Sequence, residues 1–206
     1  MRRVGILISG SGSNMVALLD GLERSRHAEP ALVLSNNPEA GGLAKAEARG
    51  VTTTVVDHRP FKGDRPAFED AVQERLEGAG VDIVALAGFL RIMTPAMIQR
   101  WEGRMLNIHP SLLPLFKGLQ THERALEAGV AVHGCTVHLV TEELDSGPIL
   151  GQAVVQVKAG DTPERLAARV LRQEHRLYPK VLNAFVAEPE RLRAAPLSIF
   201  AGPGDD

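Results

Sequence analysis

The stretch VGILISGSGSN, from Val4 to Asn14, decides the fold. It begins with an apolar run, Val4–Ile8, of the kind that forms a strand buried on both faces of a helix-covered sheet. A glycine-rich loop follows, and an amphipathic stretch, Asn14–Glu23, continues from it with helical spacing. A strand, a glycine turn and a helix in this order predict the first unit of a doubly wound parallel sheet.

The same alternation continues toward the middle of the chain. Further apolar runs predict strands at residues 31–35, 52–56, 82–88 and 104–109, and amphipathic stretches predict helices at residues 42–49, 64–79 and 95–100. This pattern is typical of an α/β protein with a Rossmann-like, mostly parallel sheet and right-handed crossovers. Ligands bind beyond the carboxyl ends of the strands in such a sheet, so the residues that follow each strand are candidate site residues.

The second half of the chain has a different pattern. Two long β-like runs, Val130–Val140 and Pro148–Val157, are separated by the polar loop TEELDSG. This spacing predicts an antiparallel pair that extends the sheet near the carboxyl terminus.

A long helix is predicted next, over Thr162–Val186. Asp161 or Thr162 is suited to be its N-cap, because a short polar side chain there can accept a hydrogen bond from the first turn. Pro179 lies inside the pattern and predicts a kink or a break, because proline lacks the N–H group that the helix needs.

Composition bounds the class of protein. The 206 residues carry a formal net charge of −2 and are 44% hydrophobic, which suits one domain with a sizeable core. We expect this domain over residues 1–187 and a loosely held tail over residues 188–206. The near-neutral charge speaks against a nucleic-acid partner. Cys135 is the single cysteine and lies in an apolar run, which predicts a buried thiol and not a nucleophile.

The sequence also gives an expectation for the cellular location. Val4–Ile8 is too short for the apolar part of a signal peptide, and no run approaches the about 20 apolar residues of a membrane span. We therefore expect a cytoplasmic protein that does not enter the membrane.

The glycine loop, Ser9–Asn14, has two interpretations. Its glycines and the helix start after them could hold a phosphate group, or they could form a tight turn without a ligand. The dinucleotide fingerprint is incomplete, because Met15 stands where the third glycine belongs and no acidic residue follows the second predicted strand. A small phosphate-binding loop remains as the functional prediction.

The stretch LNIHPSLLP, Leu106–Pro114, raises the second question. Asn107 and His109 are two residues apart in a predicted strand and therefore share a face. An amide donor beside an imidazole can stabilise an oxyanion and move a proton, although a polar strand end without a function is also possible. Asp145, in the TEELDSG loop, is the best carboxylate to hold the tautomer of the imidazole and favour its charged form.

Two other functions are possible for the polar residues of the chain: a metal site and the active site of a serine hydrolase. His133 and His138 lie at odd separation on a predicted strand, so they face opposite sides. The chain also lacks the HExxH and cysteine-rich patterns of zinc sites and the G-x-S-x-G pattern of serine hydrolases. No metal is therefore predicted.

Several motifs together resemble one family, and they cover nearly the whole chain: ISGSGSN, LAGFLRIM, LNIHPSLLP, THERALEAG, GCTVH, ELDSGPIL and QEHRLYP. The resemblance is to the folate-dependent phosphoribosylglycinamide formyltransferases of purine biosynthesis. It implies the formyltransferase fold and a reaction in which the amine of glycinamide ribonucleotide attacks the formyl group of 10-formyltetrahydrofolate. A tetrahedral intermediate would collapse and expel the folate nitrogen.

The resemblance also implies roles for individual residues. Asn107 and protonated His109 would stabilise the oxyanion, and Asp145 would support the charged imidazole and help to relay protons. The substrate would contact Gly12, Ser13 and Asn14 through its phosphate and Glu174 through its ribose. The cosubstrate would be bound by Arg65, Leu90, Arg91, Ile92, Met93, Val140 and Asp145. Without the resemblance, Glu174 would pass for an exposed helical glutamate, and Ile92 and Met93 for core residues. Nothing in the sequence decides between a monomer and a homodimer.

Three alternatives remain at this stage. Formyltetrahydrofolate deformylase has a similar core, but it normally carries an extra domain ahead of that core. Methionyl-tRNA formyltransferase adds a carboxyl-terminal domain and needs a tRNA partner. A catalytically silent module that binds folate or a nucleotide would not need Asn107, His109 and Asp145 together.

Overall fold

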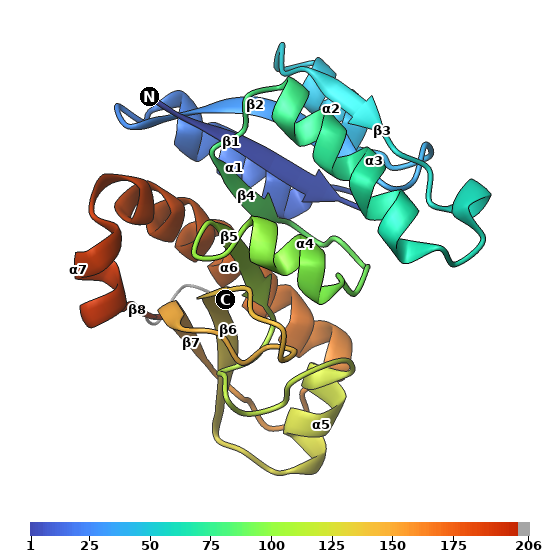
Figure 1. Cartoon of the computed structure of the whole chain (residues 1–206). Coiled ribbons are helices and arrows are strands. Elements are labelled where there is room, and N and C mark those ends of the chain that lie inside the picture. Colours follow the sequence, from blue (N-terminus) through green and yellow to red (C-terminus); the bar gives the residue numbers. More distant parts are fainter. Residues whose placement is uncertain (202–206) are drawn as a thin grey trace. The chain divides into compact units, whose positions relative to one another are not determined.

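The computed structural model describes residues 1–201. The GPGDD end of the predicted tail, residues 202–206, lies outside them. The chain forms two compact units, residues 1–107 and the residues from 108 onward (Figure 1). Strand β5 (Met105–His109) begins in the first unit and ends in the second.

The first unit is built on parallel strands. In hydrogen-bonded order they run β3-β2-β1-β4-β5, with neighbours parallel throughout. Their bounds are Arg2–Ile8 for β1, Ala28–Ser35 for β2, Thr53–Val55 for β3 and Ile83–Leu86 for β4. Residues Val4–Ile8 are all buried, which is the expected result for a strand covered on both faces.

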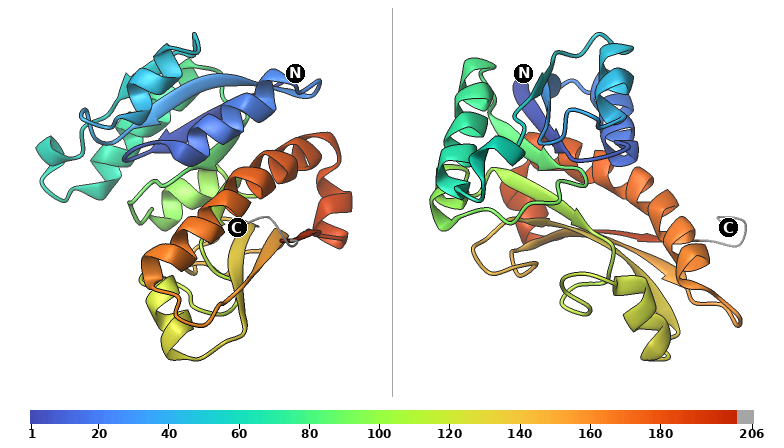
Figure 2. Two further views of the ribbon diagram at one scale, coloured as in Figure 1. Left: turned by 180° about the vertical axis from the view of Figure 1, so that it is seen from behind. Right: turned by 90° about the vertical axis from the view of Figure 1, so that its right-hand side faces the viewer.

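Helices cover both faces of these strands. They are α1 (Ser13–Glu23), α2 (Gly42–Glu47), the 3-10 turn η1 (Arg59–Phe61), α3 (Arg65–Gly78) and α4 (Pro95–Arg100). In the right-hand view of Figure 2, α1 and α2 lie on one side of the strands and α3 and α4 on the other. Asp64 caps α3 and Thr94 caps α4, each through a side-chain oxygen that accepts a backbone N–H.

The second unit contains the antiparallel pair. Strands β6 (Val132–Leu139) and β7 (Ile149–Gln156) run antiparallel, and β8 (Leu197–Phe200) lies parallel to β7. Helix α5 (Thr121–Glu127) precedes this pair. Helix α6 (Pro163–Ala187) packs against β6 and β7, as the left-hand view of Figure 2 shows. The prediction of a mostly parallel, doubly wound α/β fold with an antiparallel extension is confirmed.

Of the two outcomes predicted for Pro179, a kink or a break, the break is wrong. Helix α6 begins after the N-cap Thr162, whose side chain accepts from Arg165 N, and it continues through Pro179 to Ala187. Its buried residues lie on both sides of the proline, and they include Leu177, Tyr178, Val181 and Leu182. Packing of this apolar stripe outweighs the hydrogen bond that proline removes.

The expectation of a loosely held tail is also wrong for its described part. Pro189–Ala194 forms the short helix α7, and Leu192 is buried. Strand β8 then pairs with β7 in the register Gly151↔Leu197 to Val154↔Phe200. Four residues with one alternation are too short for a sequence pattern to reveal such an edge strand.

Within residues 1–201, no helix combines the length and apolar character that crossing a membrane requires.

Candidate active site

The turn from β1 to α1 requires glycine. Gly12 is the N-cap of α1 with φ of 71°, and a Cβ atom there would lie 2.8 Å from Gly42 Cα. Gly42 N donates to Gly10 O at 3.1 Å, and Lys45 Nζ donates to Ser11 O at 2.8 Å. The predicted phosphate-binding residues therefore lie in a turn braced by α2, at the amino end of α1, where the positive end of the helix dipole favours an anion.

Ser9 ties three loops of the first unit together. Its hydroxyl donates to Asn36 Oδ1 at 2.6 Å and accepts from Leu90 N at 2.9 Å, while Ser9 N donates to Gly88 O at 3.1 Å. These loops follow β1, β2 and β4, so the carboxyl ends of the strands converge as the topology predicts. The link to Asn36 was not predicted, because nothing in the sequence pairs it with Ser9.

The loop after β4 presents apolar side chains to the surface. Leu90 is 78% exposed and Ile92 is 65% exposed, so the interpretation of Ile92 as a core residue is wrong. Arg91 and Met93 are partly exposed, and Arg65 is exposed at the start of α3. Neighbouring exposed apolar side chains are typical of a surface that binds a ligand or a partner.

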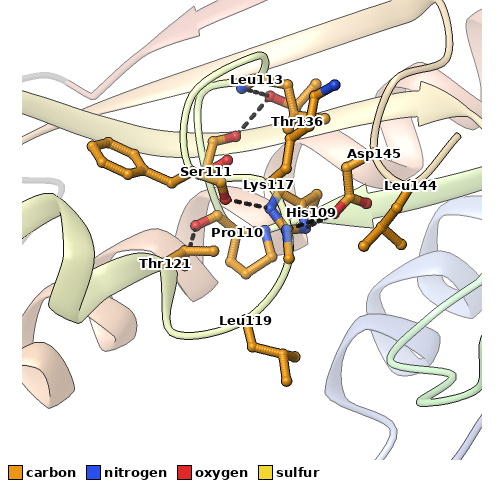
Figure 3. Close-up of polar contacts among 12 residues, drawn as sticks. His109, Pro110, Ser111, Leu113, Lys117, Leu119, Thr121, Thr136, Leu144 and Asp145 are labelled. Carbon is orange, nitrogen blue, oxygen red and sulfur yellow. Dashed lines mark hydrogen bonds and ion pairs between the residues drawn. The ribbon is translucent and has the colours of Figure 1, made fainter.

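His109 is the centre of the site in the second unit. It is 6% exposed, and its Nδ1 lies 3.4 Å from Asp145 Oδ2 (Figure 3). Its Nε2 is 3.0 Å from the carbonyl oxygen of Phe116. A carbonyl oxygen only accepts, so Nε2 donates and carries a hydrogen, and Nδ1 is the nitrogen that faces the carboxylate.

Asp145 meets His109 from the loop between β6 and β7. Its backbone has φ of 50°, a left-handed conformation that costs a non-glycine residue about 1 kcal/mol. Its Oδ2 also accepts from Gly118 N at 2.9 Å, and its Oδ1 lies 3.6 Å from His138 Nε2. The side chain of Asp145 is 7% exposed, and a carboxylate that is buried needs these partners. Val140, at the start of the same loop, is half-buried.

The loop after β5 is fastened to the Asp145 loop. Lys117 Nζ lies 3.2 Å from Glu143 Oε1 and also donates to Ser146 Oγ. Together with the bond from Gly118 N to Asp145, these contacts hold the Phe116–Gly118 segment over the imidazole of His109. Lys117 was not predicted as a site residue.

Thr136 fixes the first part of the same loop from β6. Its hydroxyl donates to Ser111 O at 2.7 Å and accepts from Leu113 N at 3.0 Å (Figure 3). Gln152, on β7, donates to Leu113 O at 2.9 Å. The path of the chain after β5 is thus set by these hydrogen bonds as well as by the two prolines of LNIHPSLLP.

Two further predicted residues are placed by their strands and helices. Asn107 is half-buried on β5, two residues before His109 and paired in register with Leu86. Glu174 is 7% exposed on α6, so the interpretation as an exposed helical glutamate is wrong. Burial raises the pKa of the Cys135 thiol, and the charge of Glu174 adds to this. The prediction of a buried thiol at Cys135 is confirmed.

His133 forms a second, buried group of aromatic rings. It is 1% exposed, with ring centroids of His122 and Phe116 at 5.3 and 5.9 Å. Neither ring nitrogen makes a hydrogen bond within residues 1–201, and burial is the main reason that the pKa of His133 is lowered to about 4. Across that same stretch, no three His, Cys, Asp or Glu side chains are placed to hold a metal ion.

We expect His133 to make the protein less stable in acid. The ordinary histidine pKa is 6.5, so between pH 6.5 and about 4 the unfolded chain binds a proton that folded His133 does not. The free energy of unfolding should therefore fall as the pH is lowered through this window, by at most about 1.4 kcal/mol per pH unit for this one group. Chemical denaturation at a series of pH values measures it.

The matched variants are His133→Leu and His27→Leu, because His27 is exposed. The first should flatten the dependence of stability on pH, and the second should leave it as in the wild type. An unchanged slope in His133→Leu would show that other groups cause the acid sensitivity.

Comparison with known proteins gives the family. The formyl transferase family model matches residues 2–182. The trifunctional purine biosynthetic protein adenosine-3 of Bos taurus is 49% identical over 191 residues, which are 92% of this chain but 19% of that protein. The chain thus spans less than a fifth of this relative.

Two other relatives match over most of both chains. Phosphoribosylglycinamide formyltransferase of Escherichia coli (strain K12) is 43% identical over 181 residues, 88% of this chain and 85% of the relative. The crystal structure of phosphoribosylglycinamide formyltransferase from Brucella melitensis has a TM-score of 0.86 and 55% identity, and covers 90% of this chain and 96% of that one. The chain belongs to the formyl transferase family.

Proposed function

We propose that the protein transfers the formyl group of 10-formyltetrahydrofolate to the amine of glycinamide ribonucleotide. The products are formylglycinamide ribonucleotide and tetrahydrofolate. The observation that carries the proposal is the buried pair of His109 and Asp145 at the end of a parallel strand, in a chain of this family. The match to the Escherichia coli formyltransferase over most of both chains supports the choice of substrates.

The chemistry needs an oxyanion stabiliser and a proton carrier. The amine nitrogen attacks the formyl carbon, and the carbonyl oxygen becomes an oxyanion. Asn107 and His109 are two apart on β5, so strand alternation directs both side chains to one face, where both can donate to that oxygen. The carbon–nitrogen bond to the folate then breaks. The amine loses one proton and the folate nitrogen gains one, so His109 and Asp145 end as they began.

The contact with Phe116 adds a requirement to this mechanism. His109 Nε2 donates to the Phe116 carbonyl, and Nδ1 faces Asp145. An imidazole with both nitrogens engaged cannot donate to an oxyanion. Nε2 must therefore exchange the Phe116 carbonyl for the substrate oxygen, which requires the Phe116–Gly118 segment to withdraw.

The ligand assignments follow from the same proposal. Gly12, Ser13 and Asn14 bind the phosphate, and the braced glycine turn at the start of α1 supports this. Glu174 binds the ribose hydroxyls, and the burial of a carboxylate on α6 is an unusual feature that favours a function. The folate is assigned to Arg65, Leu90, Arg91, Ile92, Met93, Val140 and Asp145, and exposed Leu90 and Ile92 offer it apolar surface.

Three wider expectations belong to this proposal. Residues 1–187 carry the activity, the enzyme works in the cytoplasm, and it is active as a monomer or a homodimer. None of the catalytic steps calls for a metal.

A formyl-transfer assay tests the function. The enzyme is incubated with 10-formyltetrahydrofolate, with and without glycinamide ribonucleotide, and products are followed by mass. We expect formylglycinamide ribonucleotide to appear and tetrahydrofolate to be released only when the amine is present. Release at an equal rate without the amine would identify a deformylase, and no turnover in either mixture would indicate a silent binding module.

A further inference from the structure

His138 is a buried histidine near the oxygen of the Asp145 carboxylate that His109 does not face. It lies on β6, is 2% exposed, and has its Nε2 3.6 Å from Asp145 Oδ1. The register between β6 and β7 shifts by one residue between Val137 and His138, so the sheet is irregular at this position.

The orientation of the His138 ring is fixed by its own strand. Its Nδ1 lies 2.9 Å from the carbonyl oxygen of Leu139. Because a carbonyl oxygen only accepts, Nδ1 is the donor in this contact and carries a hydrogen, so Nε2 can donate to Asp145 only when the imidazole is protonated on both nitrogens. The contact with the Leu139 carbonyl thus fixes the ring of His138 with Nε2 directed at Asp145.

The two oxygens of Asp145 have different partners. Oδ2 accepts from Gly118 N at 2.9 Å and lies 3.4 Å from His109 Nδ1, whereas Oδ1 faces His138. Rotation of a carboxylate about its last torsion angle is soft and has a broad, roughly two-fold profile. Contacts to Oδ2 alone do not set the plane of the group, but a partner on Oδ1 does.

We propose that His138 is a positioning residue for the formyl transfer: it holds Asp145 Oδ1, so that Oδ2 stays directed at His109 Nδ1. The charged and titratable groups near His138 include Asp145 and His109, and the Leu139 carbonyl contacts its Nδ1. Burial lowers the pKa of His138, whereas the Leu139 carbonyl and the negative charge of Asp145 raise it, so the carboxylate favours the protonated imidazole that can donate to it. Loss of His138 should therefore change the pH profile of kcat as well as its maximum.

Two substitutions distinguish the roles of the two ring nitrogens of His138. In His138→Gln, the amide nitrogen can take the place of Nε2 and still donate to Asp145. In His138→Asn, the shorter side chain can take the place of Nδ1 and donate to Leu139 O, but it cannot reach Asp145. We expect His138→Asn to lower kcat by between about 10- and 100-fold, with KM changed less than about threefold and a shifted pH profile. His138→Gln should keep most of kcat.

The outcomes decide the inference. If both variants lose kcat equally and in proportion to their loss in Tm, His138 has only a structural role. The positioning role is also refuted if kcat in His138→Asn stays within about twofold of the wild type. The inference rests on the proposed function, so a second measurement is independent of activity. Imidazole nitrogen NMR shifts of His109 should change in His138→Asn and stay close to the wild type in His138→Gln. Wild-type enzyme that transfers no formyl group would refute the function, whereas unchanged His109 shifts in His138→Asn would refute the positioning role.

Discussion

His109→Ala is expected to lower kcat by about 10³-fold or more, while KM for either substrate changes by less than about threefold. The substitution removes a donor to the developing oxyanion and the group that carries the proton, and each of these contributions is worth about 10²-fold or more. Both act in the transition state, so substrate binding should be largely preserved. Steady-state kinetics with each substrate varied in turn measures the two constants.

Controls must separate chemistry from folding. His109 also donates to Phe116 O and faces Asp145, so its loss leaves buried polar groups without a partner and lowers stability. Thermal unfolding should therefore be measured alongside activity, at a temperature where the variant is fully folded. His27→Ala replaces an exposed histidine and should match the wild type in both measurements. If folded His109→Ala keeps kcat within about threefold of the wild type, the imidazole is not the catalytic group.

The strands of the first unit were predictable because a strand that is buried on both faces consists of apolar residues. Val4–Ile8 is apolar at every position, and a strand buried on both faces needs this. The α4 range Pro95–Arg100 was predicted to the residue, because Thr94 and Pro95 together are a helix start. Signals of this kind lie within a few neighbouring residues.

The predictions about the fold that were wrong concern segments whose structure depends on residues far away in the sequence. Pro179 disfavours a helix locally, yet tertiary packing of α6 on β6 and β7 keeps the helix intact. Strand β8 exists because its backbone pairs with β7, about fifty residues earlier in the chain, and its four residues carry no pattern of their own. Neither outcome can be obtained from the properties of the segment alone.

The candidate site divides in the same way. Asn107 and His109 were predictable as site residues, because they are two polar residues on the same face at the end of an apolar strand. The partners that hold the site in place did not stand out: Gly118 contacts Asp145 through its backbone, and His138 lies in a run that reads as ordinary core. Backbone donors and buried histidines leave little trace in a single sequence, so the structure was needed to find them.

Asp145→Asn is expected to lower kcat by about 10²- to 10³-fold without a comparable change in KM. The substitution suits this position, because asparagine tolerates the left-handed backbone, here with φ of 50°, better than alanine does. Its amide oxygen can still accept from Gly118 N, so the loop should keep its conformation. What is lost is the negative charge 3.4 Å from His109 Nδ1, which supports the positive charge that the imidazole carries while it stabilises the oxyanion.

The control for Asp145→Asn comes from the same loop. Glu142 is an exposed carboxylate three residues earlier, and Glu142→Gln removes the same charge without touching His109. Equal kcat losses in the two variants would mean that the loop's overall charge matters and not the pairing with the imidazole. A loss confined to Asp145→Asn, with Tm close to that of the wild type, would assign the effect to the carboxylate beside His109. The pH profile adds a second criterion, because removing this carboxylate should move the acid limb of kcat, whereas Glu142→Gln should leave it in place.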